Sequence, residues 1–153
     1  MSDNIMPPLD LDLNSVDTSM PLINNGEIVD FTIVKVEKKT TKDGKTPMLS
    51  IDHKSVTPTR DVSGKELMPG VHVFNNIMLA PSGKGTWDMV ARNIAGLTQA
   101  AGLQTTLGDF INGGFNTLNG AQVRAKIAYV PEGPDKTGTV RRAKNEIAVY
   151  LKA

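Results

Sequence analysis

The chain contains no cysteine, two histidines and few aromatic residues, with four Phe, two Tyr and one Trp among 153 residues. The lack of cysteine excludes disulfides, thiolate nucleophiles and cysteine-bound metals, and it is typical of a reducing compartment. No stretch approaches the ~20 apolar residues of a membrane-spanning helix. The N-terminus also lacks the basic-then-apolar order of a signal peptide. These absences predict an intracellular protein that makes no membrane contact.

The residue patterns of the common enzyme classes are missing as well. His53 and His72 are not in a metal-ligand spacing, so we expect surface or hydrogen-bonded histidines. Carboxylates are scattered, and no Ser lies in a G-x-S-x-G motif. The segment 83–86 resembles a phosphate loop, but Met78 and Gly85 occupy the positions where that loop needs Gly and Ser or Thr. We therefore expect no catalytic activity, no metal and no cofactor.

The charge is unevenly distributed along the chain. The net charge is +1, yet residues 1–25 hold four Asp and no Lys or Arg. Residues 26–153 therefore carry 17 basic and 12 acidic residues, a net charge of +5. Pro7-Pro8 and the turn signal Asn24-Asn25-Gly26 further separate the two parts. We predict an acidic N-terminal arm over 1–25 and one folded domain over 26–153, with a charge asymmetry typical of polyanion binding.

Five segments have the composition of β-strands. In the first, apolar residues occupy odd positions up to Ile33 and even positions from Val34, which predicts a bulge or a bend. Asp43-Gly44 is a strong hairpin signal between the first two strands. We expect loops over 54–70 and 131–145, which are rich in Pro, Gly and polar residues. The expected strands are 27–39, 48–53, 71–80, 121–130 and 146–152.

One clear helix separates the third strand from the fourth. Thr86 is a good N-cap, Val90, Ile94 and Leu97 follow at helical spacing, and Gly102 ends the pattern. A further helical turn is expected over 107–112. The element order predicts a mainly β fold, specifically a closed five-stranded Greek-key barrel of the OB type with its helix between strands three and four.

Positive charge is concentrated in the two loops that grip nucleic acid in OB barrels, those joining strands 1–2 and 4–5. No acidic residue interrupts the second loop between Lys136 and Lys144, and strand four adds two outward-facing cations. The predicted phosphate contacts are Lys38, Lys39, Lys42, Lys45, Arg124, Lys126, Lys136, Arg141, Arg142 and Lys144. Solubilising lysines that protect exposed sheet edges are the alternative interpretation.

Binding of unpaired strands also needs flat side chains on which bases stack. By alternation, Phe74 and Tyr150 lie on the outward sides of strands three and five, so they are the predicted stacking residues. Packing in the core is the alternative for each of them. We assign the remaining aromatic candidates to packing, namely Phe31, Trp87, Phe110 and Tyr129.

Three segments, 11–16, 33–37 and 138–147, resemble a family of short phage proteins encoded near replication and recombination genes. Their sequences are LDLNSV, IVKVE and GTVRRAKNEI. That family is similar to phage OB-fold single-stranded DNA-binding proteins, and the resemblance extends over roughly residues 10–151. One departure is the C-terminal sequence YLKA, which differs from the acidic tail through which such proteins commonly recruit partners.

The resemblance and the basic loops together predict a protein that coats single-stranded DNA in the host cytoplasm during phage replication or recombination. Expected partners are the DNA and phage replication or recombination proteins, and homo-oligomer formation stays open. The alternative is a non-enzymatic protein-interaction module on the same barrel, either a phage structural accessory or a host-defence inhibitor. A carbohydrate-binding barrel is a weaker third reading, because the chain has a single Trp.

Overall fold

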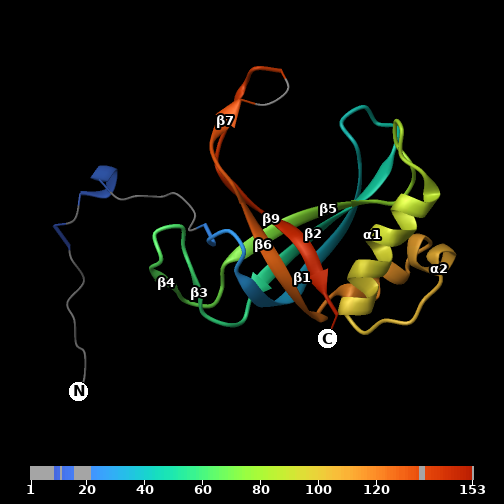
Figure 1. The fold of residues 1–153 in the computed structure, drawn as a ribbon, viewed down its shortest axis with the longest axis horizontal. Coiled ribbons are helices and arrows are strands. Elements are labelled where there is room, and N and C mark those ends of the chain that lie inside the picture. Colours follow the sequence, from blue (N-terminus) through green and yellow to red (C-terminus); the bar gives the residue numbers. More distant parts are fainter. Residues whose placement is uncertain (1–8, 11, 16–21, 135–136, 153) are drawn as a thin grey trace.

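A computed structural model describes residues 9–10, 12–15, 22–134 and 137–152 (Figure 1). The domain is built on a five-stranded antiparallel sheet with the strand order β5-β2-β1-β6-β9. These strands are β1 (Ile28–Thr40), β2 (Pro47–Ser55), β5 (His72–Met78), β6 (Gln122–Val130) and β9 (Lys144–Leu151). All five predicted strands are therefore present, with bounds that differ by up to two residues from those expected.

The helical elements lie where their capping residues predict them. In α1 (Trp87–Ala100), the Thr86 hydroxyl accepts a hydrogen bond from the amide of Met89 at 3.3 Å. Gly102 follows the helix with φ +72°, a conformation that favours glycine. Thr106 caps α2 (Leu107–Ile111) in the same way, through the amide of Asp109. The described residues also contain two 3₁₀ segments, η1 (Leu13–Ser15) and η2 (Gly114–Leu118).

The core lies between the inner face of the sheet and these helices. Val90, Ile94 and Leu97 of α1 are buried against strand residues, as their spacing predicts. Trp87, which we expected in the core, is instead 52% exposed, because the buried face of α1 begins only at Val90. The largest fully buried side chains include Phe31, Ile33, Leu49, Ile51, Leu97, Phe110, Leu118 and Ile127.

Strand β1 changes face where the sequence predicts it. Its pairing with β2 shifts register between Ile33 and Lys35, so Val34 has no partner and is exposed. Such a bulge bends the strand and increases its twist. Its first residues, 28–32, pair with β6, and its later residues extend beyond β6 to form the hairpin with β2. The bend lets one long strand serve both halves of the curved sheet.

The sheet is not closed into a barrel, which corrects the expectation from element order. β5 pairs only with β2, and β9 pairs only with β6, so these two strands form the edges of the sheet. Their side chains approach each other across a seam, but no ladder of backbone hydrogen bonds joins them in the described part of the chain. A closed barrel would require that ladder.

Two short hairpins lie in segments that we expected to be loops. β3 (Thr59–Arg60) pairs with β4 (Glu66–Leu67), and β7 (Gly133–Pro134) pairs with β8 (Val140–Arg141). Strands of two residues give no periodic signal, so the sequence pattern missed them. Within the described ranges, no helix is both long and apolar enough to cross a membrane.

Candidate functional site

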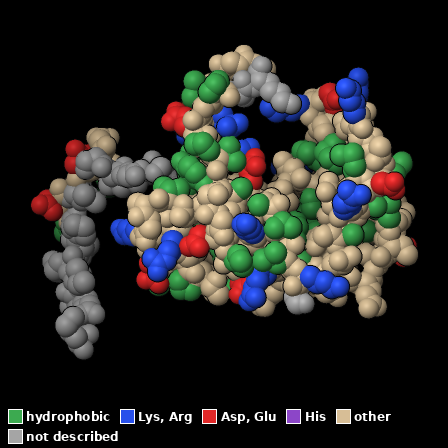
Figure 2. Space-filling view, in the orientation of Figure 1, with side chains coloured by type: hydrophobic (Ala, Val, Ile, Leu, Met, Phe, Trp, Pro, Cys, Tyr) green, Lys and Arg blue, Asp and Glu red, His purple; other side chains and the backbone are tan. Residues whose placement is uncertain are grey.

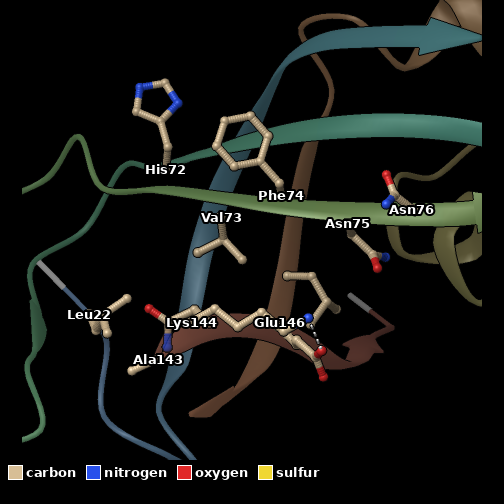
Figure 3. A pocket seen from close by; sticks show the side chains of 11 residues that line it. Leu22, His72, Val73, Phe74, Asn75, Asn76, Ala143, Lys144 and Glu146 are labelled. Carbon is tan, nitrogen blue, oxygen red and sulfur yellow. Dashed lines mark ion pairs between the residues drawn. The ribbon is translucent and has the colours of Figure 1, made fainter. Parts of the chain in front are cut away.

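A cleft of about 630 Å³ opens between the two edge strands of the sheet (Figure 3). It is lined by residues 72–76 of β5, by residues 143–147 at the start of β9, and by Leu22. In Figure 3, His72 and Phe74 lie on one side of β5, while Val73 and Asn75 point to the other. Alternation along the strand thus gives the cleft an aromatic rim on the outer face of the sheet and a seam of apolar and polar side chains below it.

Phe74 is an exposed aromatic side chain that lines the cleft. It is 57% exposed, as alternation along the third strand predicts. The His72 ring stacks against it, with ring centroids 6.3 Å apart and an interplanar angle of 19°. The carboxylate of Asp52 holds the Nδ1 of His72 at 2.7 Å. This arrangement fixes one face of the Phe74 ring and leaves a flat aromatic surface on the rim of the cleft.

Strand pairing brings further polar side chains beside this rim. Lys54 lies directly opposite His72, and Asp52 lies opposite Phe74. Lys54 is exposed and forms no ion pair with any described carboxylate. The sequence patterns did not point to Lys54 or His72 as site residues. The signal that could have found them is alternation applied to both strands together. Lys54 lies on the same outer face as Phe74, but this follows only from the register of β2 with β5.

The two basic hairpins, β1–β2 and β7–β8, lie at the two ends of the seam between β5 and β9. Residues 142–143 lead from β8 into Lys144, which lines the cleft. A second cleft of about 500 Å³ continues along the seam to Met78, which pairs with Met48 beside the β1–β2 hairpin. Both hairpins project to the same side of the sheet, upward in Figure 1. Figure 2 shows the surface hollowed between them, with Lys and Arg side chains on both sides.

The predicted cations of the hairpins differ in how far other groups hold them. Lys39 lies 3.8 Å from Glu37, and Lys144 lies 3.0 Å from Glu146, so each is partly neutralised. Arg141 is half-buried and donates to the Pro131 carbonyl at 3.4 Å, which braces the hairpin. Lys136 lies outside the described residues. The exposed cations without an ion pair to a described residue are Lys38, Lys42, Lys45 and Arg142.

Arg124 and Lys126 do not join this surface. Both are exposed on the outer face of β6, as predicted, but two strands separate β6 from β5. Arg124 is also held by Asp30, with its Nε 2.7 Å from the carboxylate. This pairing lowers the pKa of Asp30, chiefly through the hydrogen bond from Arg124. Neither residue lines a cleft, because alternation fixes the face of a strand but not its place in the sheet, and their role as phosphate contacts stays a prediction.

Tyr150 is a core residue and not a stacking platform, which corrects the second aromatic assignment. The pairing of β9 with β6 shifts register: Val149 is opposite Lys126, and Ile147 is opposite Ile127. Ala148 is therefore left without a partner, and the residues after this bulge exchange faces. Val149 points outward and is 48% exposed, while Tyr150 packs against the hydrophobic core.

A chain of hydrogen bonds crosses the seam through Tyr150. The Nδ1 of His53 lies 2.9 Å from the Val73 carbonyl, so it carries the proton and donates. The Nε2 of His53 then accepts from the Tyr150 hydroxyl at 2.9 Å. That hydroxyl accepts in turn from the Asn75 side-chain amide at 3.0 Å. One tyrosine thereby connects β9 to both β2 and β5, although the backbones of the edge strands do not pair.

Burial sets the ionisation of this network. It lowers the pKa of His53, whose side chain is fully buried, and it raises the pKa of Tyr150. Both groups are therefore neutral at physiological pH, which the hydrogen-bond directions require.

The N-terminal arm joins the domain next to the cleft. The side chain of Asn145 accepts a hydrogen bond from the amide of Ile23 at 2.7 Å and donates to its carbonyl at 2.8 Å. Ile23 is fully buried, and the preceding Leu22 lines the cleft. Leu22, the first residue of the described range 22–134, therefore lies at the cleft.

The described residues contain no cluster of three metal-ligating side chains. The candidate site is a groove lined by apolar, polar and aromatic side chains, with basic residues at its margins. No protein-family model matches the chain, and no curated protein matches it in sequence.

Proposed function

We propose that this protein binds single-stranded DNA with little sequence preference, as an OB-like module of a phage replication or recombination system. One observation carries the proposal: an exposed aromatic surface, Phe74, lies on a groove with a basic hairpin at each end. Lysine and arginine side chains beside a polyphosphate release its counterions, and an exposed ring stacks with any base. This combination favours unpaired strands, because bases inside a duplex cannot reach Phe74.

The strand arrangement supports the OB-like assignment. OB folds are partly open five-stranded barrels that bind oligonucleotides across strands two and three, between the loops joining strands 1–2 and 4–5. Here β2 and β5 correspond to strands two and three, and the two basic hairpins correspond to those loops. Early residues of β5 and β9 line the first cleft together and later residues line the second, so the two strands run in the same direction along the seam.

Titration of labelled oligo-dT and of a duplex of equal length, at two salt concentrations, tests the proposal directly. We expect tighter binding of oligo-dT than of the duplex, and an affinity that falls as salt rises. Equal affinity for both nucleic acids would contradict single-strand binding. No binding at low salt would refute the function altogether.

Replacement of Phe74 by Ala should weaken oligo-dT binding about tenfold, within the ~1–3 kcal/mol that base stacking contributes in such sites. Phe74→Tyr keeps the ring and should bind like the natural protein. The salt dependence of Phe74→Ala should be unchanged, because no phosphate contact is lost. Fluorescence anisotropy at several salt concentrations measures both quantities. Equal binding by the Ala and natural proteins would exclude Phe74 as a stacking residue.

A protein-interaction module is the second candidate, and the open edges of the sheet favour it. β5 and β9 each pair on one side only, and an extended peptide can add to such an edge. A phage structural accessory or a host-defence inhibitor on this scaffold would bind a protein partner and show no salt-dependent affinity for oligo-dT. The titration therefore separates the two candidates.

A further inference from the structure

The groove does not end at Phe74 but continues beneath α1. The second cleft is lined by residues 75–78 of β5, by residues 147–150 of β9, and by Arg92, Asn93 and Gly96 of α1. It shares Asn75, Asn76 and Ile147 with the first cleft, so the two are contiguous. The seven residues of β5 that line them span about 20 Å at ~3.3 Å per residue, which is too long for a single nucleotide to fill.

The second cleft has the chemistry of a nucleic-acid contact. Arg92 is the only charged residue among those that line it, is exposed, and forms no ion pair with a described carboxylate. Amide side chains come from both walls, Asn76 from the sheet and Asn93 from the helix. Met78 and Val149 add apolar surface. An exposed guanidinium with polar and apolar neighbours suits a phosphate with its attached sugar and base.

The electrostatics favour a polyanion over a peptide in this cleft. No carboxylate lines it, and the one carboxylate of the first cleft, Glu146, is held by Lys144 at 3.0 Å. A chain of negative charge therefore meets no unpaired carboxylate among the described residues that line either cleft.

We propose that the second cleft is a further subsite for the same single strand, in which Arg92 contacts a phosphate and Asn76 and Asn93 contact the sugar or the base. This inference rests on the proposed function. The bound strand passes from the aromatic rim at Phe74, past Asn76, to Arg92 on α1. The helix thus takes part in binding in addition to the sheet and the two hairpins.

Oligonucleotide length separates this subsite from the first cleft. OB folds occupy about 4–16 nucleotides, so dT oligomers of about 4 and about 16 nucleotides bracket the range. Arg92→Ala should weaken binding of the long oligomer about three- to fivefold, as expected for one exposed ion pair. It should also lower the steepness of the salt dependence by about 0.7, while binding of the short oligomer stays unchanged.

Two variants control for charge and folding. Arg92→Lys keeps the positive charge and should retain most of the affinity for the long oligomer. Lys65→Ala removes one exposed cation from the β3–β4 hairpin, far from α1 in Figure 1, and should change neither oligomer.

Three results would overturn the subsite. The first is equal binding of the long oligomer by Arg92→Ala and the natural protein. The second is an equal loss for both oligomers, which would place Arg92 at the first cleft or in a structural role. In both of these cases the proposed function stands. The third result is failure of the natural protein to bind any oligomer, which would remove the function and the subsite together.

Discussion

Replacement of Arg141, Arg142 and Lys144 together by Ala should weaken oligo-dT binding about 100-fold at low salt, from ~1 kcal/mol for each cation. Removing three phosphate contacts should also lower the salt slope by about 2. The loss of Lys144 has an added effect, because it leaves Glu146 unpaired in the cleft and facing the phosphates. Anisotropy titrations across a salt series measure both changes.

The controls for this variant address folding and bulk charge. Arg141 is half-buried and braces its hairpin, so the double variant Arg142→Ala, Lys144→Ala tests the exposed cations alone and should show most of the effect. Replacement of Arg60, Lys65 and Lys152 removes the same charge from outside the clefts. That variant should keep nearly all affinity. If both triple variants lose affinity equally, net charge and not the hairpin drives binding.

Tyr150→Phe should lower the free energy of unfolding by about 2 kcal/mol, because it leaves buried polar groups without partners. The Nε2 of His53 loses its donor, and the Asn75 amide loses its acceptor. The midpoint of urea unfolding should fall while its denaturant slope stays unchanged. This loss would show that the side-chain network holds the two sheet edges together where backbone pairing is absent.

Tyr129→Phe is the matched control. Tyr129 is half-buried, and its hydroxyl forms no hydrogen bond with the described residues, so its loss should shift stability by less than about 0.5 kcal/mol. Equal stability of Tyr150→Phe and the natural protein would contradict the structural role of the network.

The natural protein should also lose stability in acid through His53. Burial holds the pKa of His53 below its unfolded value of 6.5, so the folded state binds fewer protons than the unfolded state. The contribution of His53 is fully present above pH 6.5 and is lost as the pH falls below that value. Urea midpoints at intervals between neutral and acidic pH measure the loss.

Local signals predicted the elements of the fold because each depends on neighbouring residues. Thr86 and Gly102 delimit the main helix, Asp43-Gly44 marks the first hairpin, and the change of parity at Ile33-Val34 marks the bulge of β1. Phe74 was placed correctly because no irregularity interrupts the pairing of β5 with β2.

The candidate site was predicted only in part, and the failures share a physical cause. Tyr150 was placed outward because the bulge at Ala148 has no clear signature in its own strand. Arg124 and Lys126 lie on the predicted outward face but line neither cleft, because alternation does not give the place of a strand in the sheet. Arg92 was missed because its place beside the seam depends on how α1 packs on β5 and β9.

The sequence by itself determined the five strands of the main sheet, the two α-helices, the charge of the two hairpins and the absence of cysteine chemistry, because these depend on composition and on contacts between near neighbours. Only the tertiary structure decided that the sheet stays open, that Tyr150 bridges its edges, and that the hairpins share one side of the molecule. These features depend on the register and curvature of strands far apart in the chain, since Tyr150 and His53 are 97 residues apart. Packing between such distant segments fixes these features, and no local sequence pattern encodes them.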